Sequence, residues 1–125
     1  MILIDTHVVI WLYSGEIELF SEKAKREIQE NELVTSPIIK LELQYLFEIK
    51  KISRKPNEIL AELHKKTGLR ILKCDFAELI EESLKLNWTR DPFDRLIVAQ
   101  SLLTNIRLLT KDQTILKNHK LSFWE

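Results

Sequence analysis

The chain has 125 residues and a mass of 14.8 kDa, which is the size of one domain. Lys and Arg together number 19, as do Asp and Glu, so the net charge of zero indicates no general attraction to a polyanion. Hydrophobic residues make up 45% and charged residues 30%, with only 2 Gly and 3 Pro, which excludes a disordered chain and a turn-rich all-β fold.

Short apolar runs predict the strands of the domain. They lie at residues 2–5, 33–36, 69–73, 106–110 and 121–124. Several of these runs are apolar at nearly every position, rather than at every second one. Continuous apolar character is typical of parallel strands that are covered on both faces.

Capping signals predict helices between these strands. Counting each first residue, the helices run from Ser21 to about residue 30, from Ser36 to about 51, from Pro56 to about 67, from Asp75 to about 86, and from Asp91 to about 103. Proline follows Ser36 and Asp91 at the first helical position, and Gly68 is suited to end the third helix. Strands alternating with helices indicate one α/β domain over residues 1–125 with a mainly parallel sheet.

Features of the cellular environment are also readable. The single Cys74 excludes an internal disulfide and favours a reducing compartment. No apolar run approaches the roughly 20 residues of a membrane span, and no basic signal-peptide segment precedes the first predicted strand. We therefore expect a cytoplasmic protein that does not enter a membrane.

Acidic residues recur beside these apolar segments, at Asp5, Glu42, Asp94 and Asp112. Ligands of parallel sheets bind outside the carboxyl ends of the strands. Asp5 and Asp112 each follow a predicted strand directly, and Glu42 lies within two turns of a helix that begins at this edge. The helix opened by Asp91 begins at the same edge if the strand after it is parallel, so four distant segments can converge there.

Asp5, Asp94 and Asp112 each have a second interpretation as residues that stabilise the start of a helix. Asp5 is suited to cap a helix that begins near Thr6, and Asp112 to cap a short helix through residues 115 and 116. Asp91 is a natural cap, and Asp94 in the first turn suits the helix dipole. The local sequence leaves both roles open at each position.

Glu42 is harder to explain as a structural residue. It lies near the centre of an apolar helix face, at about 100° per residue, whose other members are Ile38, Ile39, Tyr45, Leu46 and Ile49. An acid meant for solvent would lie on the opposite side of this helix. Its position favours a functional role.

Clustered carboxylates repel each other and take up protons unless a cation intervenes. Oxygen ligands of this kind suit Mg²⁺ or Mn²⁺, and no His or Cys residues have the spacing of a zinc site. His7 lies two residues after Asp5 and is either a supporting residue or a surface residue. Glycine-rich phosphate loops and a Gly-x-Ser-x-Gly motif are absent. The pattern favours metal-dependent hydrolysis of a phosphodiester.

Four segments in order resemble the PIN domain, specifically a VapC-type toxin ribonuclease of a type II toxin–antitoxin system. They are residues 4–11 (IDTHVVIW), 36–43 (SPIIKLEL), 90–100 (RDPFDRLIVAQ) and 109–112 (LTKD). The third segment is the most specific, and the similarity extends over nearly the whole chain. It implies a three-layer α/β/α sandwich around a parallel sheet and Mg²⁺- or Mn²⁺-dependent cleavage of RNA. It also implies a homodimer and inhibition by a small cognate antitoxin.

The resemblance also implies roles for individual residues. Asp5, Glu42, Asp94 and Asp112 carry over as the catalytic and metal-binding acids. Thr6 and Thr110 are expected as hydroxyl supports, and Asp91 as either a cap or an outer carboxylate. Arg90, Arg95 and Lys111 are candidates for contacts with RNA phosphates, although Arg95 is equally suited to pair with an acid.

Other functions fit less well. A PIN-like binding module without activity, acting through protein or RNA, is the main alternative. A haloacid-dehalogenase-type phosphatase needs two acids two residues apart after its first strand, and the residue two after Asp5 is His7. A receiver domain needs an Asp at the end of its middle strand, and the run ending at Ser36 has none.

Overall fold

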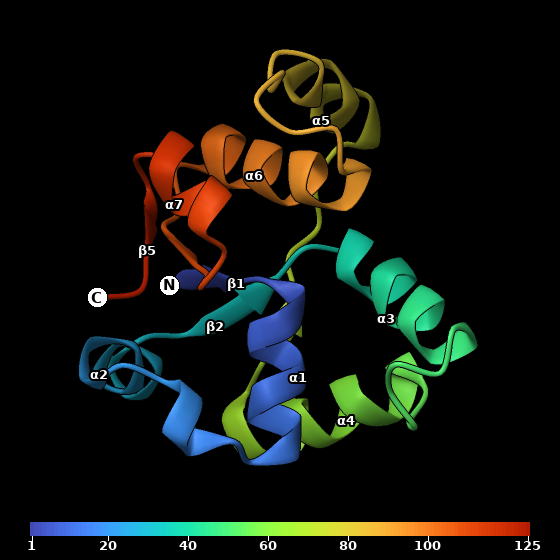
Figure 1. Ribbon diagram of the computed structural model, residues 1–125, viewed down its shortest axis with the longest axis vertical. Helices are drawn as coiled ribbons and strands as arrows, with labels where there is room; N and C mark the ends of the chain where they lie inside the picture. The colour runs from blue at the N-terminus through green and yellow to red at the C-terminus, as the bar shows by residue number, and fades with distance from the viewer.

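The computed structural model describes residues 1–125 and has a parallel sheet at its centre (Figure 1). Its five strands lie in the order β3-β2-β1-β4-β5, and every neighbouring pair is parallel. The strands are β1 (Ile2–Ile4), β2 (Leu33–Thr35), β3 (Arg70–Ile71), β4 (Leu108–Leu109) and β5 (Ser122–Phe123). Each falls inside a run predicted from the sequence, and the sheet that was predicted to be mainly parallel is parallel throughout.

Seven α-helices and one short 3-10 helix connect these strands. The first half of the chain forms α1 (Thr6–Ser14), η1 (Ile17–Leu19), α2 (Glu22–Glu30), α3 (Ile38–Glu48) and α4 (Pro56–Thr67). The second half forms α5 (Phe76–Ser83), α6 (Pro92–Thr104) and α7 (Gln113–Asn118). No helix is long and apolar enough to span a membrane.

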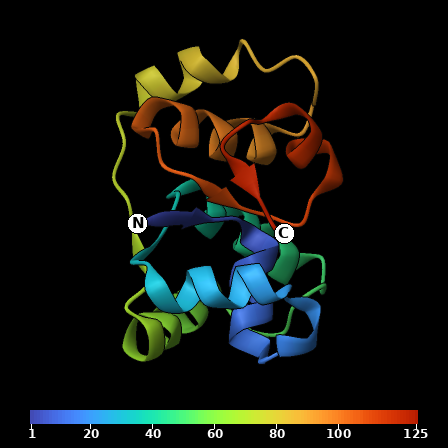
Figure 2. The same ribbon diagram turned by 90° about the vertical axis from the view of Figure 1, so that its left-hand side faces the viewer.

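The helices form a layer on each side of the sheet, so the predicted three-layer sandwich is confirmed (Figures 1 and 2). One layer holds α5, α6 and α7, and the opposite layer holds α1, α2 and α4. Helix α3 contacts both α4 and α6 and therefore bridges the two layers. Because α3 follows β2 directly, this bridge lies at the carboxyl edge of the sheet.

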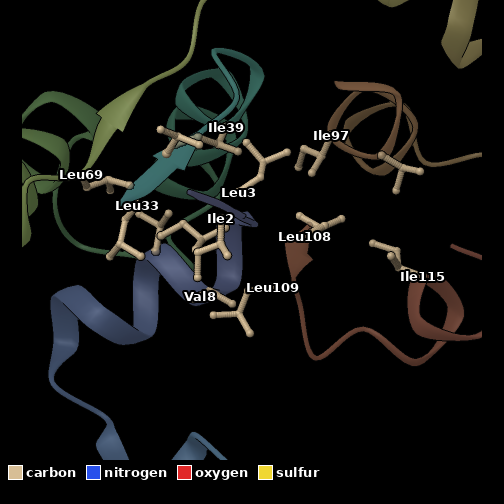
Figure 3. Close-up of a cluster of buried hydrophobic side chains, with 14 of the residues drawn as sticks. Ile2, Leu3, Val8, Leu33, Ile39, Leu69, Ile97, Leu108, Leu109 and Ile115 are labelled. Atoms are coloured by element: carbon tan, nitrogen blue, oxygen red, sulfur yellow. The ribbon is translucent and has the colours of Figure 1, made fainter. Parts of the chain in front are cut away.

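The core lies on both faces of the sheet (Figure 3). Every residue of β1 and β2 is buried, which is the pattern of strands covered from two sides. Ile39, Ile97 and Ile115 bring side chains from three helices into the same core, with Ile115 on the side of Leu108 in β4. Burial of each such side chain contributes about 1.5–3 kcal/mol to the stability of the fold.

Capping side chains set several helix boundaries. Ser21 accepts a hydrogen bond from the backbone N–H of Ala24 at 3.0 Å and begins α2 as predicted. Gly68 has φ of 77° and ends α4 as predicted. Helix α5 ends at Ser83, three residues before the expected boundary.

Helix α3 differs most from the prediction. It ends at Glu48 rather than near Lys51, because Lys50 adopts a left-handed φ of 64° and the Lys51 N–H bonds back to the Leu46 carbonyl at 2.8 Å. No glycine marks this turn, so the sequence gives no signal for it.

The predicted apolar face of α3 is also wrong in part. Tyr45 and Ile49 are 50% and 43% exposed, whereas Leu43 is completely buried. Leu43 lies one turn after the buried Ile39, and these two residues mark the side that faces the sheet.

Candidate active site

A hollow of about 450 Å³ lies where β1 and β4 end. β1 and β4 are also the strands at which the chain order of the sheet changes direction, which is the usual ligand position in such sheets. Five acids line the hollow: Asp5, Glu42, Asp91, Asp94 and Asp112. The structure therefore brings together all four of the predicted acids and the ambiguous Asp91.

Asp5 serves as both a helix cap and a lining residue of the hollow. Its Oδ1 accepts a hydrogen bond from the Val8 N–H at 3.2 Å, which caps α1. Its Oδ2 accepts a hydrogen bond from the Thr110 hydroxyl at the end of β4. Asp5 is only 7% exposed, and burial raises the pKa of its carboxyl although both hydrogen bonds oppose the shift.

Glu42 projects from α3 into the same hollow and is half-buried. The Thr6 hydroxyl, at the start of α1, donates a hydrogen bond to its Oε1. Burial raises the pKa of Glu42, and the charges of Asp91 and Asp5 add to the increase. The two threonines expected as supports each donate to one of the predicted acids.

Asp91 and Asp94 both line the hollow at the start of α6, but only Asp91 caps the helix. Oδ1 of Asp91 accepts from the N–H groups of Phe93 at 2.9 Å and Asp94 at 3.2 Å, so Asp91 caps the helix. Burial raises the pKa of Asp94 to about 7, with further increases from the charges of Asp91, Asp112, Glu42 and Asp5. The negative charges of all four other acids of the hollow therefore disfavour the ionised form of Asp94.

Asp112 is likewise both a helix cap and a lining residue of the hollow. Its Oδ1 accepts from the Ile115 N–H at 2.9 Å and caps α7. Its own N–H donates to the Thr110 hydroxyl oxygen at 3.1 Å, next to Asp5. The cap and site interpretations that the sequence left open are therefore compatible at Asp5, Asp91 and Asp112.

The donor set of the hollow fits a hard divalent cation. All five acids offer oxygen ligands, and the raised pKa values of Asp5, Glu42 and Asp94 indicate that uncompensated negative charge is costly here. No three His, Cys, Asp or Glu side chains already stand close enough together to enclose a metal ion. Mg²⁺ keeps several of its waters and needs only one or two direct carboxylates, so the arrangement suits ligation partly through water.

Only one of the three residues predicted to contact RNA phosphates lines the hollow. Lys111 lines the hollow, whereas Arg90 and Arg95 do not. Nε of Arg95 donates to the Thr89 carbonyl at 2.7 Å, and Arg95 forms no ion pair. The suggested pairing of Arg95 with an acid is therefore wrong, because a backbone carbonyl holds this side chain.

Sequence reasoning missed two residues that line the hollow, Trp11 and Gln113, and left His7 open. Trp11 lies one helical turn after His7, with ring centroids 6.0 Å apart. The i, i+4 spacing could have found Trp11 if the helix after Asp5 had been predicted outright. Gln113 directly follows Asp112 and had no separate signal.

Comparisons with known proteins bear on the family and the fold of this chain. The model of the PIN domain family matches residues 2–120. A toxin–antitoxin complex from Klebsiella pneumoniae contains a chain of similar fold, with a TM-score of 0.68 and 18% identity over 98% of this chain and 96% of that one. The structure of VapBC2 from Rickettsia felis, bound to a DNA fragment from its promoter, gives a TM-score of 0.69 and 19% identity over 100% and 98%. None of the curated proteins matches the sequence.

Proposed function

Because this chain belongs to the PIN domain family, we propose that its acidic hollow is the active site of a Mg²⁺- or Mn²⁺-dependent endoribonuclease. Family membership indicates a nuclease, a hydrolase of phosphodiester bonds. The observation that carries the finer proposal is the convergence of five acids from four separate segments at one edge of the sheet, with the pKa of Asp94 raised to about 7. Such a cluster is costly to fold and suits a site built for a cation.

Asp5, Glu42 and Asp94 would hold the ion directly or through water, and Asp112 would complete the site. Bound there, Mg²⁺ or Mn²⁺ supplies a more acidic water and positive charge against the phosphate. The chain's own residues orient the donors: Thr110 and the Val8 N–H fix both oxygens of Asp5, and Thr6 fixes Glu42. Such fixed carboxylates need little reorganisation when substrate arrives.

The remaining predicted residues would have supporting roles around this site. Asp91 positions the start of α6, and thereby Asp94, through its two backbone hydrogen bonds. Lys111 supplies a positive charge at the hollow for a phosphate of the RNA. Arg90 and Arg95 lie on the same segment as Asp94 and would contact RNA only outside the hollow.

We further propose that the enzyme is the toxin of a toxin–antitoxin pair, active in the cytoplasm and inhibited by a small cognate antitoxin. The support is the similarity of fold, over nearly the full length, to chains of two toxin–antitoxin complexes. Coexpression with the gene beside its own would test this. The proposal requires that the neighbouring product relieve any growth arrest and copurify with the chain.

A homodimer is the assembly that we propose. Leu41, Tyr45 and Ile49 form an apolar stripe on α3 at 58%, 50% and 43% exposure, spaced one turn apart. A second copy of the chain would cover this stripe. Light scattering after gel filtration should give twice the mass of one chain, and Tyr45→Glu should reduce it to a monomer.

Cleavage of a mixed RNA pool tests the ribonuclease proposal directly. Purified antitoxin-free protein would be assayed with Mg²⁺, Mn²⁺ or EDTA, beside Asp94→Ala and the matched control Asp75→Ala. Asp75 also lies at a helix start but is exposed and outside the hollow. We expect cleavage that is lost with EDTA and in Asp94→Ala and retained in Asp75→Ala.

The main alternative, a binding module without activity, predicts a different result. RNA or a protein partner would then bind, but no condition would produce cleavage. Full cleavage by Asp94→Ala with metal present would show that the acids of the hollow are not the catalytic residues.

A further inference from the structure

Trp11 is the only hydrophobic residue among those that line the acidic hollow. Its ring is half-buried and makes edge-to-face contacts with Phe20, with centroids 6.3 Å apart, and with Trp124, at 6.0 Å. The ring of His7 lies against it at 6.0 Å. A large aromatic ring is therefore held in a fixed position beside the carboxylates.

Lys111 supplies a positive charge at the same place. Its ammonium lies 5.7 Å from the Trp11 ring centroid and 5.9 Å from that of Trp124. Although acids line the hollow around it, Lys111 forms no ion pair, and its one hydrogen bond is a long 3.5 Å contact to the Leu19 carbonyl. The side chain is exposed, so the ammonium can leave the ring at little cost.

We propose that Trp11 and Lys111 form a nucleotide subsite that selects single-stranded RNA. An unstacked base lies on the Trp11 ring, and the ammonium of Lys111 moves from that ring to a phosphate of the same strand. The phosphate replaces the ring as the partner of Lys111, and the base replaces Lys111 as the partner of the ring. This inference rests on the proposed function, since it takes the carboxylates as the place of cleavage.

The chemistry of the subsite explains the choice of single strands. Bases in an RNA duplex are stacked and paired, so they cannot lie on a protein ring, whereas bases of loops and ends can. Stacking on an aromatic residue tolerates every base because each has a π-face. The subsite would therefore restrict the enzyme to unpaired RNA while leaving sequence choice to other residues.

Binding in EDTA, in an Asp94→Asn background, separates this subsite from cleavage. The probes are short oligo(A) and oligo(U) strands and an RNA duplex of equal length, measured by anisotropy. Trp11→Leu should weaken binding of the single strands about tenfold, with Trp11→Phe showing a smaller loss. Trp88→Leu is the matched control, because Trp88 is also half-buried but does not line the hollow.

Lys111→Met tests the second half of the subsite, because methionine keeps most of the chain length without the charge. It should make the plot of log affinity against log salt shallower by about 0.7, the value for one phosphate contact on a single strand. Combined with Trp11→Leu, its effect should be less than additive, since each side chain prepares the position of the other.

Tryptophan fluorescence provides a measurement that survives if Trp11→Leu does not fold. Oligo(A) should quench the emission of the chain with all 3 Trp and of Trp88→Leu, and Trp11→Phe should lose most of the quenching. Single-strand binding by folded Trp11→Leu as tight as without that change, or duplex binding as tight as single-strand binding, would overturn the subsite.

The two proposals fail separately. RNA cleavage with binding that does not depend on Trp11 would remove the subsite and keep the ribonuclease. Binding that depends on Trp11, without cleavage under any metal, would keep the subsite and remove the ribonuclease.

Discussion

The hydroxyl of Thr110 donates a hydrogen bond to Oδ2 of Asp5, so the ends of β4 and β1 are joined at the base of the acidic hollow. Both side chains are buried, and the same Thr110 oxygen accepts from the Asp112 N–H at 3.1 Å. One hydroxyl thus positions two of the acids, although residues 5 and 110 lie at opposite ends of the chain.

Thr110→Val should therefore destabilise the protein beyond the loss of an ordinary hydrogen bond. The substitution keeps the shape but leaves a buried carboxylate oxygen without its donor, which costs about 1–3 kcal/mol. Thermal unfolding would measure the change. Thr35→Val is the control, because the Thr35 hydroxyl is equally buried but donates at 2.9 Å to the neutral Ile4 carbonyl. An equal loss in both variants would show that the charge of Asp5 is irrelevant.

Asp94→Asn should stabilise the metal-free protein at pH 8. The folded-state pKa of Asp94 is raised to about 7 from an ordinary 3.8, so its carboxylate opposes folding once the pH exceeds the unfolded value. This cost grows from about pH 4 to pH 7, and the variant lacks it. Because Asp94 is partly open to solvent, screening reduces the gain to roughly 1 kcal/mol.

Unfolding of both proteins in EDTA at pH 4 and pH 8 would measure this difference. The gain should be present at pH 8 and absent at pH 4. Added Mg²⁺ should raise the melting temperature of the protein with Asp94 more than that of the variant. A variant that is less stable at pH 8 in EDTA would contradict the repulsion described for the hollow.

Glu42→Gln should lower RNA cleavage at least 10²-fold, the usual scale for losing a preorganised electrostatic group. The amide preserves size and can still accept from Thr6, so the fold should persist. Glu48→Gln, on the exposed part of the same helix, should cleave normally. Single-turnover rates at saturating Mg²⁺ would compare the two, and equal rates would exclude a catalytic role for Glu42.

His119 should make the fold less stable in acid. Its ring is 4% exposed, and Nε2 lies 2.8 Å from the Ser101 hydroxyl oxygen. Burial lowers the pKa of His119 below its ordinary 6.5, so below pH 6.5 the unfolded chain binds a proton that the folded chain does not. The contribution of neutral His119 to the free energy of unfolding is therefore fully present above pH 6.5, and it falls as the pH drops towards the folded-state pKa.

Urea unfolding of His119→Gln between pH 8 and pH 5 would isolate this contribution. The variant should lose part of the decline that the unaltered protein shows in that window. His64→Gln should retain the decline, because His64 is on the exposed surface. An unchanged pH profile in His119→Gln would assign the acid sensitivity to other groups.

Local signals in the sequence were sufficient for most of the secondary structure. Ser21, Asp75 and Asp91 cap helices where predicted, and Gly68 ends one. The end of α3 was missed because Lys50 has the left-handed conformation at this helix end. Glycine usually occupies such a position and would have marked it in the sequence. Helix α1 was predicted only through the possible role of Asp5 as a helix cap. Residues 8–12 are all apolar, so they show no amphipathic periodicity that would mark a helix.

The candidate site was predictable in its acids and less so in its other residues. Asp5 and Asp112 could be placed because parallel strands end at one edge. Trp11 and Gln113 were not placed, because Trp11 required α1 to be predicted outright and Gln113 had no signal of its own. Arg95 is held by the Thr89 carbonyl, a local contact within the same segment, although its sequence position had suggested a phosphate or an acid.

The sequence by itself determined the strands, most helix boundaries, the parallel sheet and the acids that could meet at its edge. These follow from capping and periodicity, which act between residues a few positions apart. Only the tertiary structure decided that Thr110 holds Asp5, that Trp11 faces the acids, and that the pKa of Asp94 is raised to about 7. Desolvation and charge repulsion depend on distances in space, and the packing of the core sets those distances between segments far apart in the chain.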